Sequence, residues 1–466
     1  MNRPYTAWRL TSLLVILLLS TAVIVSIISV NQPLANSLSQ NNFTLRIMLL
    51  FYSATFLAGF LGRLILSQYT VFLGCIFTLI GLTLLSLTTS VIWGTTFVIA
   101  GTSMLYINLV NLCFTVSDTA KMKRIVVALL IYLVLLTSTF SYPIASILLQ
   151  RVGQANTYLI IGILAAVILF LYVFIDHFVV NPVLHNRHSL TQYNYWQIMG
   201  LIGLVLVVLY LIHYSLTHMV ATSITCAAMG LIVVGYLCVK RHFMWLFVSL
   251  IFFAYWFNAN IHFNVIHSYH HFLHSEGWRF SIKRIGYTKL YSLASIATIL
   301  IGILLAITFK WVPGVRKLSS YHGILIGIYL GALSSFFPWL GSVVHTHGTH
   351  VLPWPWLMVT MITQGTSNLM MTVSATALCA QWFGGEQRLM LLGSITTISG
   401  VALLCSHHFM DFFLPIHHML HMQYFQIEPP LMLALSLLNI VWAILLSVVL
   451  KTHYRHTKSF DLYVAN

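Results

Sequence analysis

Long runs of apolar residues dominate the chain and predict helices that cross a membrane. A spanning helix needs about 20 predominantly apolar residues. Runs of about this length occur fourteen times: Leu10–Val30, Leu45–Leu66, Val71–Ile92, Thr95–Val116, Ile125–Leu149, Thr157–Val179, Trp196–Leu216, Met219–Val239, Phe243–Ile266, Tyr287–Phe309, Ile324–Val344, Trp354–Cys379, Leu389–Ser406 and Pro430–Leu450. We therefore expect an all-α polytopic membrane protein with 14 transmembrane helices.

The composition excludes a soluble enzyme. Hydrophobic residues make up 59% of the 466 positions and charged residues only 6%. A soluble domain carries about 25% charged residues. The formal net charge is +15, from 22 Lys and Arg against 7 Asp and Glu. No motif in the sequence calls for a cofactor.

The distribution of the basic residues along the chain predicts its topology in the membrane. With the N-terminus placed in the cytoplasm, 16 Lys and Arg fall in inner segments and 6 in outer segments. Lys and Arg concentrate in cytoplasmic loops of membrane proteins. We expect both termini to be cytoplasmic, in a bacterial inner membrane or a plasma membrane. The charge therefore needs no nucleic-acid partner to explain it.

A polar, proline-containing stretch at 181–189 divides the chain. It predicts an N-terminal six-helix half over 1–180, a linker and two inserted helices over 181–242, and a C-terminal six-helix half over 243–466. Two six-helix halves around a central cavity are the plan of the major facilitator superfamily.

Several short stretches carry the spacing of a known transporter family. They are Gly59–Arg63 followed by Gly74, Gly101–Asn108, Tyr132 with Pro143 eleven residues later, Trp356 with Asn368, and Gly384–Gly393. In these places, and in its two inserted helices, the chain resembles the proton-dependent oligopeptide transporter (POT) family. The resemblance implies the major facilitator fold, alternating access, short-peptide substrates and proton coupling.

The residues that couple the resembled family to protons are replaced in this chain. Val15–Val30 contains no charge, Tyr106 stands at a Lys position, and Asn368 stands at a Glu position. Buried carboxylates serve as proton relays because desolvation raises their pKa. The seven acids here all fall at predicted helix ends or in loops: Asp118, Asp176, Glu276, Glu386, Asp411, Glu428 and Asp461. Coupling is then absent, or a histidine carries it.

Amides, hydroxyls and aromatics remain at mid-helix depth as candidates for a central cavity. A buried amide is costly unless it is paired, so each must face another helix or water. They would either bind a peptide-like substrate or hold helices together by hydrogen bonds. The candidates are Tyr106, Asn108, Tyr132, Trp256, Asn258, Asn260, Gln364, Ser367 and Asn368.

Histidines gather on the predicted outer side, 15 against 7. Three runs at 267–274, 345–350 and 407–421 belong to the C-terminal half. His270 and His274 share a helical face, and with His345 and His347 they are weak candidates for a metal site. A pH sensor near the ordinary histidine pKa, or a wet polar loop surface, is the alternative.

Other function classes stay open. Paired histidines ligate haem in membrane cytochromes, although His262, His407 and His408 lie near predicted helix ends. The missing carboxylates also fit a sensor with a transporter fold and no transport. A carrier of another small organic solute is a further alternative. The expected partners are a peptide or small-molecule substrate, membrane lipid and, if coupled, protons.

Overall fold

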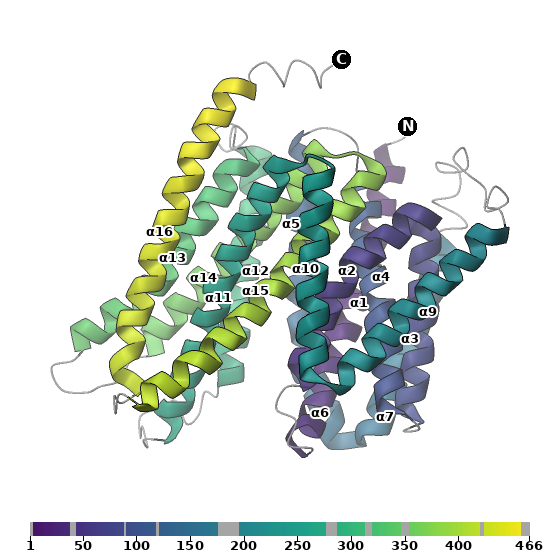
Figure 1. Ribbon diagram of the computed structural model, residues 1–466, viewed down its shortest axis with the longest axis horizontal. Coiled ribbons are helices and arrows are strands. Elements are labelled where there is room, and N and C mark those ends of the chain that lie inside the picture. The colour runs from purple at the N-terminus through teal and green to yellow at the C-terminus, as the bar shows by residue number, and fades with distance from the viewer. Residues whose placement is uncertain are drawn as a thin grey trace. The chain divides into compact units, whose positions relative to one another are not determined.

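The computed structural model describes residues 3–37, 43–87, 90–117, 121–175, 195–275, 287–312, 319–345, 354–419 and 424–457. Within these ranges the chain is helical, without strands. The helices are α1 (Arg3–Ser37), α2 (Phe43–Ile65), α3 (Ser67–Ser86), α4 (Val91–Val116), α5 (Lys121–Thr137), the short 3₁₀ helix η1 (Ser138–Phe140), α6 (Ser141–Val152), α7 (Gln154–Ile175), α9 (Tyr195–Thr217), α10 (Met219–Val239), α11 (Phe243–Ser275), α12 (Tyr287–Trp311), α13 (Ser320–His345), α14 (Trp354–Trp382), α15 (Gly385–Met419) and α16 (Tyr424–Thr457) (Figure 1).

The prediction of an all-α fold with 14 transmembrane helices is confirmed. In the described ranges α5, η1 and α6 form one span, which brings the helical segments of membrane length to fourteen. The interruption falls just before Pro143, whose ring cannot occupy a helix interior without displacing a backbone hydrogen bond. Among the described residues, thirteen segments are apolar enough to cross a membrane by length and composition. The fourteenth is α14, whose polar residues lower its hydropathy.

The chain divides into two compact units. Unit 1 comprises residues 1–246 and 379–404, and unit 2 comprises 247–378 and 405–466. Helix α15 therefore contributes its first part to unit 1 and its last part to unit 2. The domain boundaries expected near 180 and 242 stay a prediction, and residues 176–194 lie outside the described ranges.

Glycines bring α3 and α4 of unit 1 into close contact. A side chain at Gly81 would meet the carbonyl oxygen of Gly94 at 2.6 Å, and one at Gly101 would meet that of Gly74 at 2.6 Å. Small residues at such spacing let the backbones of membrane helices approach closely. Two of the glycines that carry the family resemblance, Gly74 and Gly101, therefore act here as packing residues.

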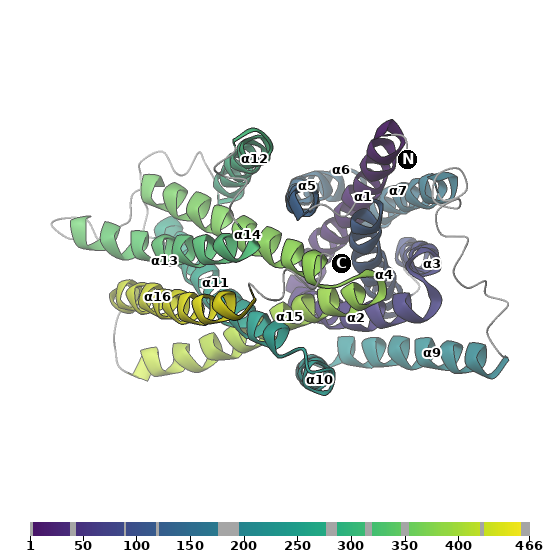
Figure 2. The same cartoon turned by 90° about the horizontal axis from the view of Figure 1, so that it is seen from above.

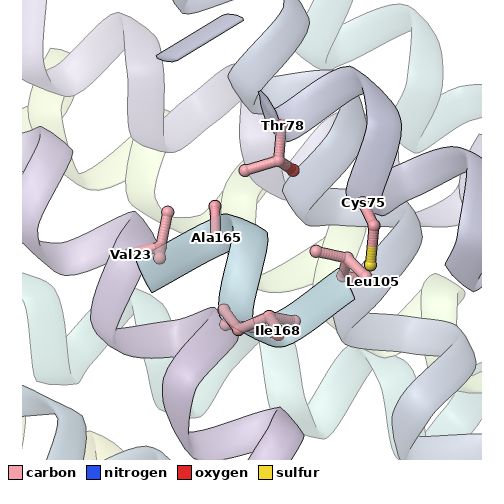
Figure 3. Close-up of a pocket in the computed structure, with 7 residues that line it drawn as sticks. Val23, Cys75, Thr78, Leu105, Ala165 and Ile168 are labelled. Carbon is pink, nitrogen blue, oxygen red and sulfur yellow. The ribbon is translucent and has the colours of Figure 1, made fainter. Parts of the chain in front are cut away.

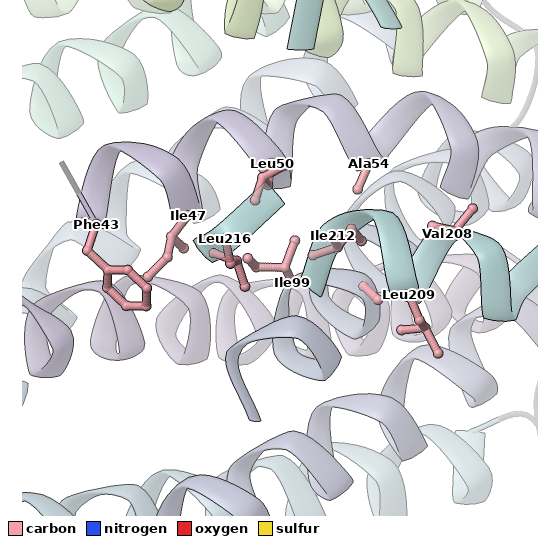
Figure 4. Packing of buried hydrophobic residues seen from close by; sticks show 10 residues of the cluster. Phe43, Ile47, Leu50, Ala54, Ile99, Val208, Leu209, Ile212 and Leu216 are labelled. Carbon is pink, nitrogen blue, oxygen red and sulfur yellow. The ribbon is translucent and has the colours of Figure 1, made fainter. Parts of the chain in front are cut away.

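Helices α2, α4 and α9 share an apolar cluster in unit 1 (Figure 4). Dispersion contacts and small gaps govern such packing, because hydrocarbon outside the helices is as apolar as the cluster itself. Figure 4 shows these side chains on the first half of α2, from Phe43 to Ala54, and on the last part of α9, from Val208 to Leu216. The cluster comprises Phe43, Ile47, Leu50, Ala54, Ile99, Ala100, Val208, Leu209, Ile212 and Leu216.

Large apolar side chains cover much of the exposed surface. On α10, Val220, Ile224 and Leu231 are 71%, 64% and 73% exposed. A soluble protein rarely exposes contiguous apolar surface of this kind. These faces suit contact with lipid, and together with the long apolar helices they identify an integral membrane protein.

In unit 2, α13 and α16 lie side by side (Figure 2). The Ser436 hydroxyl of α16 donates to the Ala332 carbonyl of α13 at 2.8 Å. The neighbouring Gly331 leaves room for larger side chains, because a side chain there would meet the Tyr255 ring at 3.0 Å and Ser367 Oγ at 3.2 Å. This close approach positions the polar residues described next.

Candidate functional site

Two helices of unit 2 carry a stripe of polar residues each. On α11 the stripe is Tyr255, Asn258 and His262, at spacings of three and four residues. On α14 it includes Gln364, Ser367 and Asn368. Residues three, four and seven apart share one face of a helix. The two stripes meet, and Tyr255 and His262 form one hydrogen-bonded cluster with the three residues of α14.

Gln364 is the centre of this cluster. Its amide nitrogen donates to Tyr255 Oη at 3.1 Å and to Asn368 Oδ1 at 3.0 Å. Its carbonyl oxygen Oε1 accepts from Ser334 Oγ at 2.5 Å and lies 3.1 Å from His262 Nδ1. All four polar positions of the Gln364 amide are thus occupied, which fixes its orientation.

Tyr255 and Ser367 extend the cluster to the backbone of α13. The Tyr255 hydroxyl lies 2.6 Å from Asn368 Oδ1 and 2.5 Å from Ser367 Oγ. Ser367 in turn donates to the carbonyl oxygen of Gly327 at 2.6 Å. Such chains of hydrogen bonds lower the cost of burying each member. The cluster therefore holds α11, α13 and α14 in register.

Asn258 of α11 forms a separate hydrogen bond to α16. Its Nδ2 donates to Oδ1 of Asn439 at 2.9 Å, and the two residues are 1% and 3% exposed. Buried side-chain atoms with no hydrogen-bond partner remain among the described residues of the same unit, namely Ser249 Oγ, Trp256 Nε1, Asn258 Oδ1, His262 Nε2 and Thr360 Oγ1. Buried polar atoms of this kind need an explanation, because nearly all such atoms in native proteins are paired.

Aromatic and aliphatic side chains surround the polar residues. Trp256 packs edge-on against Phe252 and Tyr255, with ring centroids 6.2 and 5.8 Å apart. Ile261 and Leu357 are buried in an apolar cluster next to the site. Excluding water in this way strengthens every electrostatic interaction inside the cluster.

Three predicted site residues lie in unit 1 and do not belong to this cluster. Tyr106 is half-buried on α4, with its ring 6.0 Å from that of Phe51. Asn108 is fully buried, and its Nδ2 donates to the carbonyl oxygens of Ala58 and Met104 at 3.3 and 2.9 Å. Tyr132 is half-buried on α5. The contacts of Asn108 favour a role in joining α4 to α2.

The remaining candidates divide by whether the structure describes them. Asn260 is half-buried on α11. The side chains of the weak metal candidates His270, His274 and His345, together with residue His347, lie outside the described residues. In the part of the chain that is described, no three His, Cys, Asp or Glu side chains gather closely enough to hold a metal ion.

Four residues of this site were not among the candidates predicted from the sequence: Tyr255, His262, Ser334 and Asn439. The spacing of Tyr255 and His262 around Asn258 was a usable signal, because the three share a helical face. Ser334 and Asn439 gave none. Their partners lie 30 and 181 residues away along the chain, and only the packed helices bring them together.

The gap between α1, α3, α4 and α7 in unit 1 is not a second site. Its lining is mostly apolar, with two hydroxyl groups, and consists of Ser20, Val23, Cys75, Thr78, Leu105, Ala165 and Ile168 (Figure 3). It has no room for a water molecule. We regard it as imperfect packing.

Known proteins resemble this chain in structure and not in sequence. No family model and no curated protein matches it. A POT family transporter solved with a thioalcohol-conjugated peptide superimposes with a TM-score of 0.67 at 16% identity, covering 95% of this chain and 96% of the other. A structure from a study of substrate recognition in proton-dependent oligopeptide transporters gives 0.64 at 14%, covering 97% and 99%.

A transporter of another class shows a similar likeness. The human organic anion transporter MFSD10 (TETRAN) superimposes with a TM-score of 0.61 at 12% identity, covering 94% of this chain and 99% of the other. The matches extend over nearly the whole of both chains in each case. The expectation drawn from the short motifs is therefore confirmed for the fold: this chain has the major facilitator fold of the POT family transporters.

Proposed function

We propose that this protein is a secondary transporter that carries short peptides or peptide-like solutes by alternating access. The observation that carries the proposal is the buried cluster around Gln364 and Asn368, which combines amide, hydroxyl and imidazole groups on α11 and α14 of unit 2. Such groups pair with peptide N–H and C=O groups without requiring a net charge. The fold supports a carrier rather than an enzyme.

Two features separate this proposed carrier from the family that it resembles. The Glu position on α14 holds Asn368, and the cluster contains no carboxylate among the described residues. An amide does not titrate, so it cannot relay a proton as a buried carboxylate does. We propose transport that does not use the family's carboxylate pathway, in a bacterial inner membrane or a plasma membrane, with both termini in the cytoplasm.

Uptake into proteoliposomes tests the proposal. The purified chain is reconstituted and supplied with radiolabelled dialanine or trialanine, with and without a pH gradient. Saturable uptake is expected, and Asn368→Ala should weaken it. Asn156→Ala is the matched control, because Asn156 is an exposed residue of α7 in unit 1 whose amide donates to the carbonyl oxygen of Val152 at the end of the preceding helix α6. Failure to take up any peptide would overturn the proposed substrate class.

A small organic solute other than a peptide is the second candidate, since an organic anion transporter shares the fold. Competition between labelled dialanine and a panel of organic acids and amines distinguishes the two. A sensor without transport would bind a ligand and release none across the bilayer. A Soret absorption band in the purified protein would instead favour the haem hypothesis.

A further inference from the structure

The connection between α14 and α15 in unit 1 is short and open to solvent on one side. It consists of Phe383 and Gly384, and α15 begins at Gly385. Both glycines are exposed, and a side chain at either position would meet nothing within 4 Å. Gly385 has a φ of +32°, in the left-handed region that favours glycine. A molecule can therefore approach the backbone at the start of α15 without meeting a side chain.

The first turn of α15 presents backbone N–H groups to this open space. The N–H of Arg388 donates to the carbonyl oxygen of Gly384 at 3.3 Å, which is the bond that opens the helix. The N–H groups before it belong to the first turn, where a helix offers them no partner of its own. Together with the helix dipole they favour an anion. Every helix start shares this property, so the side chains around it decide whether it is a site.

Arg388 supplies a buried positive charge at this helix start. The residue is 7% exposed, and its Nη1 is buried with no hydrogen-bond partner. Its Nε donates to the carbonyl oxygen of Phe383 at 3.2 Å, which places the guanidinium group beside the connection. The ring of Phe114 lies 5.7 Å from the guanidinium carbon and attracts the charge, but it has no oxygen that Nη1 could bind. A buried guanidinium N–H without an acceptor is costly, so this atom calls for a partner.

A second guanidinium group lies close to the first. Arg124 of α5 donates through Nη1 to the carbonyl oxygen of Gln381, in the last turn of α14, at 3.2 Å. Its positive charge lies within electrostatic reach of the Arg388 guanidinium group. Two like charges in a partly buried region repel each other, and an anion within reach of both stabilises the pair.

The turn between α10 and α11 adds further positive charge. The ring of His242 in this turn lies 5.3 Å from the ring of Phe383, so the turn is adjacent to the connection between α14 and α15. Lys240 and Arg241 directly precede His242 and are exposed. A surface with several positive side chains attracts anions from solution and from a membrane surface. On the proposed topology this end of unit 1 faces the cytoplasm.

We propose that the start of α15 binds a phosphate group, which is held by Arg388, Arg124 and the backbone N–H groups of the first helical turn. The planar guanidinium group matches the geometry of phosphate oxygens and forms charge-assisted hydrogen bonds with them. The phosphate belongs to the headgroup of an anionic phospholipid or to a soluble phosphate. The site lies wholly in unit 1, whereas the polar cluster around Gln364 lies in unit 2, so this inference does not depend on the proposed transport.

Thermal unfolding of the purified full-length protein in a neutral detergent tests the inference. Inorganic phosphate is titrated against sodium chloride at equal ionic strength, and in a second series phosphatidylglycerol replaces phosphatidylcholine in the micelles. A ligand that binds only the folded state raises the unfolding temperature in a concentration-dependent manner. We expect inorganic phosphate or phosphatidylglycerol to stabilise the protein beyond its matched reference. Stabilisation by inorganic phosphate identifies a soluble ligand, and stabilisation by phosphatidylglycerol alone identifies a lipid headgroup.

Arginine variants show whether the stabilisation arises at this site. Arg388→Met removes the buried charge, and we expect the half-saturating ligand concentration to rise about tenfold or more, as the loss of a charge-assisted hydrogen bond implies. Arg124→Gln should also raise it. Arg151→Gln is the control, because Arg151 is an exposed arginine in the last turn of α6 in the same unit and its loss lowers the net charge equally.

A pair of variants at Gly384 keeps the test independent of how the arginines contribute to folding. Gly384→Asp places a carboxylate in the open space, and Gly384→Asn places an uncharged side chain of nearly the same size there. The Cβ atom of either would meet nothing within 4 Å. The carboxylate should repel the phosphate group and weaken binding by about tenfold or more. The asparagine variant should bind within about twofold of wild type.

A carboxylate of the chain itself is the alternative occupant of the site. The side chains of Asp118 and Glu386, which are near Arg124 and Arg388 in the sequence, lie outside the described residues. If phosphate or phosphatidylglycerol stabilises Asp118→Asn or Glu386→Gln and not wild type, a carboxylate fills the site and the inference is wrong. Equal stabilisation of wild type, Arg388→Met and Gly384→Asp would also overturn it, as would the absence of stabilisation by both ligands.

Discussion

The contact between α2 and the first part of α15, both in unit 1, gives a test of packing. A side chain at Gly59 would meet the carbonyl oxygen of Leu389 at 2.7 Å, about 0.7 Å inside ordinary contact at 3.4 Å. Gly393 faces Phe56 Cα at 2.9 Å in the same way. In both places the atoms that an added side chain would meet belong to the backbone. Backbone atoms of a helix cannot move away by rotation, as the end of a flexible side chain can. The helices must separate to admit even one methyl group.

Gly59→Ala therefore should destabilise the protein. Overpacking of this kind costs about 1–3 kcal/mol. Alanine also favours a helix over glycine by about 1 kcal/mol, which partly masks the cost. Gly200→Ala provides the reference, because a side chain at Gly200 on α9 meets nothing within 4 Å. The difference between the two variants isolates the clash.

The assay is thermal unfolding of the purified protein in detergent, followed by tryptophan fluorescence and by recovery of monodisperse protein after heating. We expect Gly59→Ala to unfold at a lower temperature than wild type and Gly200→Ala to unfold at the same or a higher one. The reasoning fails if both variants behave alike, because α2 and α15 would then not pack through Gly59.

Three further substitutions test the polar contacts. Tyr255→Phe removes the hydroxyl that joins α11 to α14, so it should lower stability by about 1 kcal/mol and raise the KM for uptake. Asn108→Ala should cost about 1–2 kcal/mol, measured by thermal unfolding, and leave the KM unchanged, because its amide bonds the Ala58 carbonyl of α2. Arg46→Met should speed hydrogen exchange at the end of α9, because the Arg46 guanidinium donates to the Leu216 carbonyl at 3.0 Å and stabilises the helix C-terminus.

The helices could be predicted from the sequence because a bilayer imposes a simple rule. Every backbone polar group must be satisfied within the segment that crosses it, so apolar runs of the right length become helices. Even the polar run that begins at Thr95 lies within α4, where it is largely buried against other helices of unit 1. The charge distribution and the spacing of glycines then favoured one transporter fold, and the structural comparisons agree with it.

The site was less predictable because hydrophobic periodicity does not identify partners. Gln364, Ser367 and Asn368 were selected for their polarity at mid-helix depth, and the structure joins them in one cluster. His262 was assigned to the outer set because it lies near the end of an apolar run. Its hydrogen bond to Gln364 depends on how α11 and α14 pack against each other. The spacing of polar residues along either helix does not predict that contact.

The polarity of α14 connects the fold to the proposed activity. This helix has the polar residues that make it the one segment of membrane length, among those described, that fails a simple hydropathy criterion. A chain that needed only a stable bundle could place apolar residues at all of these positions at little cost, because replacing both partners of a buried hydrogen bond by apolar groups can be nearly neutral or stabilising. The cluster satisfies nearly all of its own hydrogen bonds and leaves acceptor atoms unpaired at His262 and Asn258. Structural bonding alone explains the satisfied atoms. Unpaired acceptors also occur at Asn108 and Asn111 of unit 1, so they do not by themselves mark a binding site. The proposed function rests instead on the amide, hydroxyl and imidazole groups that α11 and α14 bring together.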